Sequence, residues 1–105
     1  MSKLSTTTNA DWLDLPHAGE VVLSEFMEPL DLTSAQLAPS LLVDQARLDD
    51  VITGKRPIDA DMDLRLTRYF RLSEGYFLNI KVRLDTLAAK RTLNGELDRI
   101  MPRAA

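Results

Sequence analysis

The segment that most constrains the fold of this chain is residues 33–56, TSAQLAPSLLVDQARLDDVITGKR. Its apolar residues recur every three or four positions, which is the spacing that places side chains on one face of an α-helix. They are Leu37, Ala38, Leu41, Val43, Leu48, Val51 and Ile52. The spacing is broken once, between Val43 and Leu48, where the chain must change direction. The segment therefore predicts two short helices joined by a tight turn.

Polar residues mark the ends of these two helices. Thr33 precedes the first helix, where its hydroxyl can accept a hydrogen bond from a free N–H of the first turn, and Asp44 is placed to do the same for the second. Gly54 follows the second helix as a stop signal, and Lys55 and Arg56 come next as paired positive charges. This order is typical of a helix-turn-helix, which places its second helix in the major groove of DNA.

Composition indicates one ordinary globular domain. The chain has 105 residues, of which 45% are hydrophobic, so it can bury a single core. It contains no apolar run of the roughly 18 residues that a membrane span requires and no apolar signal-peptide core, so we expect neither membrane association nor export. The absence of cysteine excludes disulfides and fits a cytoplasmic location. The net charge of −3 argues against a strongly basic nucleic-acid binder.

The remaining periodicity divides the chain into three parts. We expect a flexible N-terminal extension over residues 1–14, a helix-turn-helix domain over residues 15–92 and a C-terminal tail over residues 93–105. Within the domain, a first helix should follow His17, which we expect to make a local hydrogen bond at its start. Two later helices should cover about residues 60–71 and 74–90, with Asp59 and Ser73 as N-caps. The fold class is therefore all-α, with five helices and room for a short sixth in the tail.

Two stretches allow a second interpretation. Trp12, which lies between acidic residues, is interpreted either as a cap over the domain surface or as an anchor for a partner. Asp59, Asp61 and Asp63 alternate as calcium ligands do in a loop, but the glycine and glutamate that complete such a loop are missing. We interpret these three carboxylates as charges that favour the start of a helix.

A set of short motifs between Leu15 and Arg83 falls in register with a known family. The motifs are His17-Ala18-Gly19-Glu20, Phe26-Met27-Glu28-Pro29-Leu30, Gln36-Leu37-Ala38, Gly54-Lys55-Arg56-Pro57-Ile58, Ala60-Asp61, Leu64-Arg65-Leu66, Arg68-Tyr69-Phe70 and Tyr76-Phe77-Leu78-Asn79-Ile80. With them the chain resembles the HigA/VapI group of bacterial antitoxins, within the Xre/Cro-like helix-turn-helix family. The resemblance implies a lambda-repressor-like domain. It also implies a homodimer that binds and neutralises a RelE-like ribonuclease toxin and represses its own operon.

The same register places a set of residues at operator DNA. They are Ser34, Gln36, Gln45, Ala46, Arg47, Asp50, Lys55 and Arg56. Arg47 can pair with a guanine, Gln45 with an adenine, and Asp49 or Asp50 with a cytosine amine. Lys55 and Arg56 can contact phosphate. The long apolar stripe of the helix expected at residues 74–90 exceeds what one small neighbour would cover. We therefore expect four residues at the dimer interface, namely Phe77, Ile80, Leu84 and Leu87.

Several residues depart from the family pattern and keep an alternative open. Leu42 stands where the family has a turn glycine, and Pro39 lies within a helical segment, where it is costly unless it falls in the first turn. Asp44, Asp49 and Asp50 place negative charge close to a polyanion. The alternative is a protein-interaction module of the same fold that has lost operator binding. An enzyme is not expected, because we find no nucleophile–base pair, metal cluster or phosphate-binding glycine loop, and no cofactor is predicted.

Overall fold

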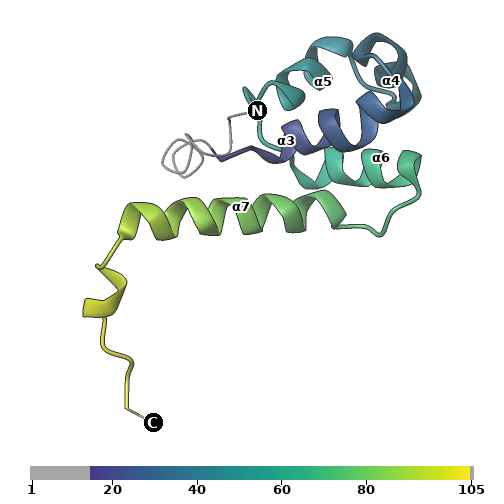
Figure 1. Ribbon diagram of the computed structural model, residues 1–105. Coiled ribbons are helices and arrows are strands. Elements are labelled where there is room, and N and C mark those ends of the chain that lie inside the picture. Colours follow the sequence, from purple (N-terminus) through teal and green to yellow (C-terminus); the bar gives the residue numbers. More distant parts are fainter. Residues whose placement is uncertain (1–14, 105) are drawn as a thin grey trace.

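The computed structural model describes residues 15–104, and every regular element in that range is helical (Figure 1). Along the chain the elements are α3 (Ala18–Val21), the π-helix η1 (Val22–Met27), the 3-10 helix η2 (Glu28–Leu30), α4 (Ser34–Leu41), α5 (Gln45–Ile52), α6 (Ala60–Phe70), α7 (Tyr76–Leu93) and the 3-10 helix η3 (Leu97–Arg99). Because α3, η1 and η2 run on without a break, the predicted all-α fold of five helices is confirmed. In place of the short sixth helix allowed for the tail, the structure has only the single 3-10 turn η3. The N-terminal extension and Trp12 lie outside the described residues.

Within residues 15–104, none of the helices combines the length and the apolar character that a membrane crossing would require.

The first helix changes its winding twice. His17 caps it as expected, because its Nδ1 accepts the N–H of Glu20 at 3.1 Å. The chain then widens into η1, and a wider turn brings residues five apart onto one side, so that Val22 and Met27 are both fully buried. Pro29 has no N–H with which to continue the pattern, and the chain tightens into η2 around it.

The helix-turn-helix pair forms where the sequence places it. Thr33 Oγ1 accepts the N–H of Gln36 at 3.1 Å, and Gln36 Oε1 accepts the N–H of Thr33 at 2.9 Å, so the predicted cap is confirmed as a complete capping box. Asp44 is the N-cap residue of α5, but its side chain makes no capping hydrogen bond. The expected hydrogen bond of Asp44 is therefore wrong, although the helix begins where it was predicted.

Pro39 lies inside α4 beyond its first turn, so of the two placements left open by the sequence the costly one is observed. The carbonyl that its missing N–H would have bonded belongs to Ala35, which is exposed and can bond water instead. Burial of Leu37, Ala38 and Leu41 on the opposite face holds the short helix in place.

Three helical segments end on a residue other than glycine in the left-handed region. These residues are Asp31, Leu42 and Arg71, with φ of 58°, 62° and 61°. After each of them the next N–H bonds the carbonyl five residues earlier, from Leu32 to Met27 at 2.9 Å, from Val43 to Ala38 at 3.1 Å and from Leu72 to Thr67 at 2.8 Å. This is the Schellman arrangement, and its apolar residue packs against the core in all three cases.

Leu42 gains little packing in return for its positive φ, because its bulky side chain is 82% exposed. We expect Leu42→Gly to raise the free energy of unfolding by about 0.5–1 kcal/mol, since relief of strain exceeds the extra flexibility of glycine in the unfolded chain. Urea denaturation would measure this. Ser40→Gly, at an exposed position inside α4, is the matched control and should lower the same quantity by a similar amount. A loss of stability in both variants would contradict the argument.

One apolar core joins all the larger helices. It consists of Ala18, Val22, Met27, Leu37, Ala38, Leu41, Leu48, Val51, Ile58, Met62, Leu66 and Phe77. Phe26 closes one side of it with tilted and edge-on contacts to Phe70, Tyr76 and Phe77, whose ring centroids lie 5.2–5.9 Å from its own. This core fixes α4 and α5 relative to α6 and α7.

Helix α7 is capped from a distance. The expected N-cap Ser73 is wrong, because α7 begins at Tyr76 with Gly75 at the N-cap position and no capping side chain of its own. Instead the carboxylate of Asp63, on α6, is only 1% exposed and accepts three backbone N–H groups. They come from Gly75 at 2.6 Å, Phe77 at 2.9 Å and Leu78 at 3.1 Å. Asp63 therefore serves the start of α7, whereas the sequence suggested the start of its own helix. At the start of α6, Asp59 caps as predicted, accepting the N–H of Met62 at 2.8 Å.

The first half of α7 packs against α3 and α6, and its second half extends beyond the body of the domain (Figure 1). Phe77, in the first turn, has no exposed surface. The expectation that Phe77 lies at the dimer interface is therefore wrong, because a side chain without exposed surface cannot contact a second chain. Ile80 and Leu84 are half-buried and Leu87 is 39% exposed, so these three residues retain surface for a partner.

Candidate nucleic-acid interface

The N-terminal ends of α4 and α5 meet on the side of the molecule away from α7 (Figure 1). A hydrogen bond joins them, from Gln45 Nε2 to Ser34 Oγ at 3.4 Å. Gln45 and Ala46 are exposed at the start of α5, and Ser34 is half-buried at the start of α4. The fold thus brings together three of the residues expected at DNA. Gln36 also lies on this side, with its amide oxygen engaged in the capping box.

The loop after α5 carries the expected phosphate contacts. Lys55 and Arg56 are both exposed, and the backbone N–H of Arg56 bonds the carbonyl of Asp50 at 3.0 Å, which ties the loop to the helix. Gly54 makes this loop possible. Its φ is 86°, and a Cβ there would lie 2.9 Å from Nε2 of His17, so any side chain would be both strained and crowded.

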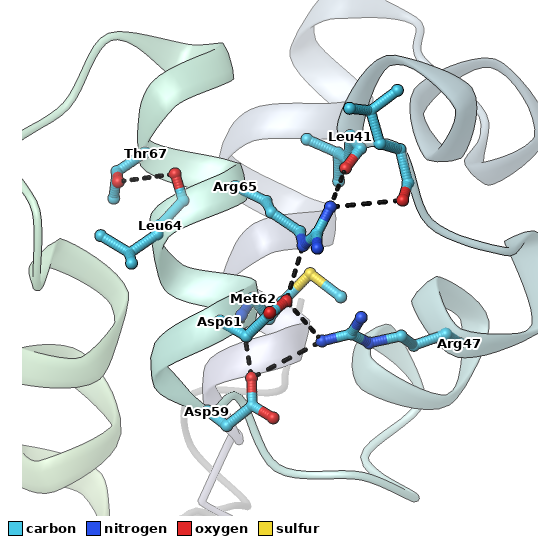
Figure 2. Close-up of polar contacts among 9 residues, drawn as sticks. Leu41, Arg47, Asp59, Asp61, Met62, Leu64, Arg65 and Thr67 are labelled. Carbon is cyan, nitrogen blue, oxygen red and sulfur yellow. Dashed lines mark hydrogen bonds and ion pairs between the residues drawn. The ribbon is translucent and has the colours of Figure 1, made fainter.

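Arg47 does not point outward with Gln45. Figure 2 shows its guanidinium reaching toward the start of α6, where Nη2 lies 2.8 Å from Oδ1 of Asp61 and 3.8 Å from Oδ1 of Asp59. Arg65 Nε donates to the same Asp61 oxygen at 2.6 Å. Its Nη1 also donates to the carbonyls of Leu41 at 2.9 Å and Leu42 at 3.2 Å, so Arg65 joins the helix-turn-helix turn to α6.

This cluster gives Arg47 a structural role that sequence reasoning missed. Asp61 and Arg65 are four residues apart on one helix, which is a recognisable ion-pair spacing, but nothing local connects either of them to Arg47. The three carboxylates of the alternating set do not converge on a common point. Asp59 caps α6, Asp61 binds two arginines and Asp63 caps α7.

The Asp61 cluster makes the contact between α5 and α6 sensitive to acid. Hydrogen bonds from Arg65 first, and then from Arg47, hold the pKa of Asp61 below its ordinary value. A depressed folded-state pKa stabilises the fold above the ordinary pKa, and this stabilisation is lost as the pH falls through the depressed value. We expect NMR titration of the Asp61 carboxyl carbon to show a midpoint that rises more in Arg65→Ala than in Arg47→Ala. Lys81→Ala should leave it unchanged, and an unchanged midpoint in Arg65→Ala would contradict this assignment.

The outer face of α5 remains acidic. Asp49 and Asp50 are half-buried, and in the part of the chain that the structure describes neither forms an ion pair. Positive charge therefore reaches this face from the loop, through Lys55 and Arg56, and not from α5 itself.

Comparison with known proteins identifies the family. No protein-family model matches the chain. Virulence-associated protein I of Dichelobacter nodosus is 33% identical over 75 residues, which cover 71% of this chain and 69% of that protein. The structure of PA4674 from Pseudomonas aeruginosa in complex with its operator DNA has a TM-score of 0.78 and 32% identity, covering 86% of this chain and 97% of that one. The antitoxin HigA of the same organism, solved with the higBA promoter, has a TM-score of 0.73 and 28% identity, covering 85% of this chain and 97% of that one.

The two solved relatives share the fold of this chain over almost their whole length, and the expected resemblance is confirmed. The chain belongs to the HigA- and VapI-type family of helix-turn-helix antitoxins and regulators.

Proposed function

We propose that this chain is an antitoxin that binds operator DNA and represses its own operon. The observation that carries the proposal is the exposed start of α5, held against the start of α4 by Gln45 and Ser34, with Lys55 and Arg56 on the adjoining loop. This geometry lets α5 enter the major groove while the loop contacts phosphates on its edge. The operator DNA bound by PA4674 and the promoter solved with HigA, both with similar chains, support the same use of the fold.

Gln45 is the first candidate for a contact with a base, because it is exposed and can make two hydrogen bonds to an adenine. Arg47 can reach a guanine only if its guanidinium leaves Asp61. Its contact with a base therefore stays a prediction. If the contact forms, Arg47→Ala should weaken operator binding by about 1–3 kcal/mol. Asp50 is the acceptor for a cytosine amine in the same scheme.

The proposal includes a homodimer and a toxin. A two-fold dimer presents two copies of α5, which matches an operator with two half-sites. Because α7 lies on the side of the domain opposite α5, dimer contacts through α7 would leave both copies of α5 free for DNA. Family membership supports the second partner, a RelE-like ribonuclease that the antitoxin holds in a complex and so keeps from its RNA. Co-purification with the product of the neighbouring reading frame tests this partner directly.

A gel-shift titration with the DNA upstream of the gene tests operator binding. At low salt, about 50 mM, we expect retardation at micromolar dimer or below, and weaker retardation of unrelated DNA of equal length. The acidic face of α5 favours the alternative, a protein-interaction module without operator binding. No retardation at micromolar dimer, together with retained toxin binding, would establish that alternative.

A further inference from the structure

A groove lies between the start of the first helix, the loop after α5 and the middle of α7. Its cavity volume is about 250 Å³, and its apolar lining comes from Leu15, Pro16, Ala18, Ile58, Leu84 and Ala88. A cavity of roughly 150 Å³ already accepts a molecule of the size of benzene, so this α7 groove has room for one or two aliphatic side chains. Ala88 remains exposed in its wall, so residues 15–104 leave the groove open.

The C-terminal segment of the same chain carries apolar side chains that nothing in residues 15–104 covers. After α7 the chain turns at Asn94 and Gly95 and runs away from the body of the domain (Figure 1). Leu97, Ile100 and Met101 are 46%, 66% and 80% exposed. Three large apolar residues within five positions of an exposed segment indicate a surface that is covered by a partner.

Groove and tail also match in charge. The groove is lined by Arg56 and by Lys81 and Asp85, which form an ion pair with each other at 2.8 Å. Within the tail, residues 96–101 carry Glu96 and Asp98 on either side of Leu97, followed by Arg99, and a second guanidinium, Arg103, lies beyond them. In the dimer without DNA, Arg56 can therefore meet Glu96 or Asp98 at the edge of the apolar contact, and such rim charges fix the register of an interface.

We propose that the tail of one copy of this chain, residues 96–101, docks in the α7 groove of a second copy. This inference rests on the proposed homodimer and specifies its contacts. Each chain offers both the groove and the tail, so a two-fold axis near the exposed half of α7 forms the contact twice. Two antiparallel copies of α7 would carry each tail past the Leu84 and Ala88 face of the other chain.

Disulfide trapping tests the contact, because the chain contains no cysteine. We expect a mixture of the Ala88→Cys and Leu97→Cys variants to form a disulfide-linked dimer that contains one copy of each. The control is a mixture of Val82→Cys and Leu97→Cys. Val82 is 58% exposed on α7 but does not line the groove, so this mixture should form little of the linked species. If the double variant Ala88→Cys/Leu97→Cys links within one chain and the mixture does not link, the tail folds back on its own chain and the proposal is overturned.

Sedimentation equilibrium separates this inference from the dimer itself. Ile100→Asp should raise the dimer dissociation constant at least tenfold, and Val82→Asp less than threefold, because both add one charge at an exposed apolar position but only the first lies in the tail. A dimer that Ile100→Asp leaves unchanged would overturn the tail contact while the proposed homodimer survives. A wild-type mass that remains at the 11.8 kDa of one chain at tens of micromolar would overturn both.

Discussion

Asp63→Ala should lower the free energy of unfolding by about 3–5 kcal/mol, the largest loss that we expect from a single substitution. The carboxylate is buried and accepts the N–H groups of Gly75, Phe77 and Leu78. Each hydrogen bond to a charged acceptor contributes about 1.5–3 kcal/mol, and alanine would leave three donors at the start of α7 without a partner. Since small domains are stable by only about 5–15 kcal/mol, the variant should be close to unfolding at 37 °C.

Urea denaturation measures this loss. The slope of the free energy of unfolding against urea concentration should be the same for the wild type and Asp63→Ala if only stability changes. The stability of Asp63→Asn should lie between those of the wild type and Asp63→Ala. Its amide oxygen can still accept from Phe77 and Leu78, but its amide nitrogen cannot accept the N–H of Gly75. Glu74→Ala is the matched control. Glu74 is also acidic and close to the start of α7, but it is exposed, so its loss should stay below about 1 kcal/mol. Equal losses in Asp63→Ala and Glu74→Ala would refute the role of the buried carboxylate.

Replacing Lys55 and Arg56 together by alanine should weaken operator binding by about 100- to 1000-fold at 0.15 M salt. The reason is counterion release. A dimer would lose four phosphate contacts, and the slope of log K against log salt should fall by roughly 0.9 for each of them. The effect should be similar on operator and unrelated DNA, because phosphate contacts carry no sequence information.

A salt series of gel-shift or fluorescence titrations checks this expectation. The control is Arg68→Ala, which removes one exposed positive charge from the C-terminal end of α6. It should be compared with the single variants Lys55→Ala and Arg56→Ala. It should change both affinity and slope by less than either loop variant. An unchanged salt slope in the double variant would show that this loop does not contact phosphate, whatever the protein binds.

The sequence alone was sufficient where the interactions are local. The caps made by Thr33, His17 and Asp59 and the stop at Gly54 all involve residues within a few positions of each other. The apolar period of residues 33–56 follows from helix geometry. These features place the two helices of the helix-turn-helix, and with the motifs between Leu15 and Arg83 they were enough to indicate the family.

Only the tertiary structure decided the features that depend on how the helices cross. Asp63 reaches donors that lie 12–15 residues further along the chain, so its capping of α7 depends on how α6 and α7 pack. Arg47 meets Asp61, 14 residues away, where α5 lies beside α6, and this pairing turned an expected base-reading side chain toward the protein. Phe77 shares a helix face with residues that remain open to a partner, but the body of the domain ends partway along α7. A linear pattern gives the period of a helix, whereas the crossing angles and the extent of the core decide which part of each face is buried.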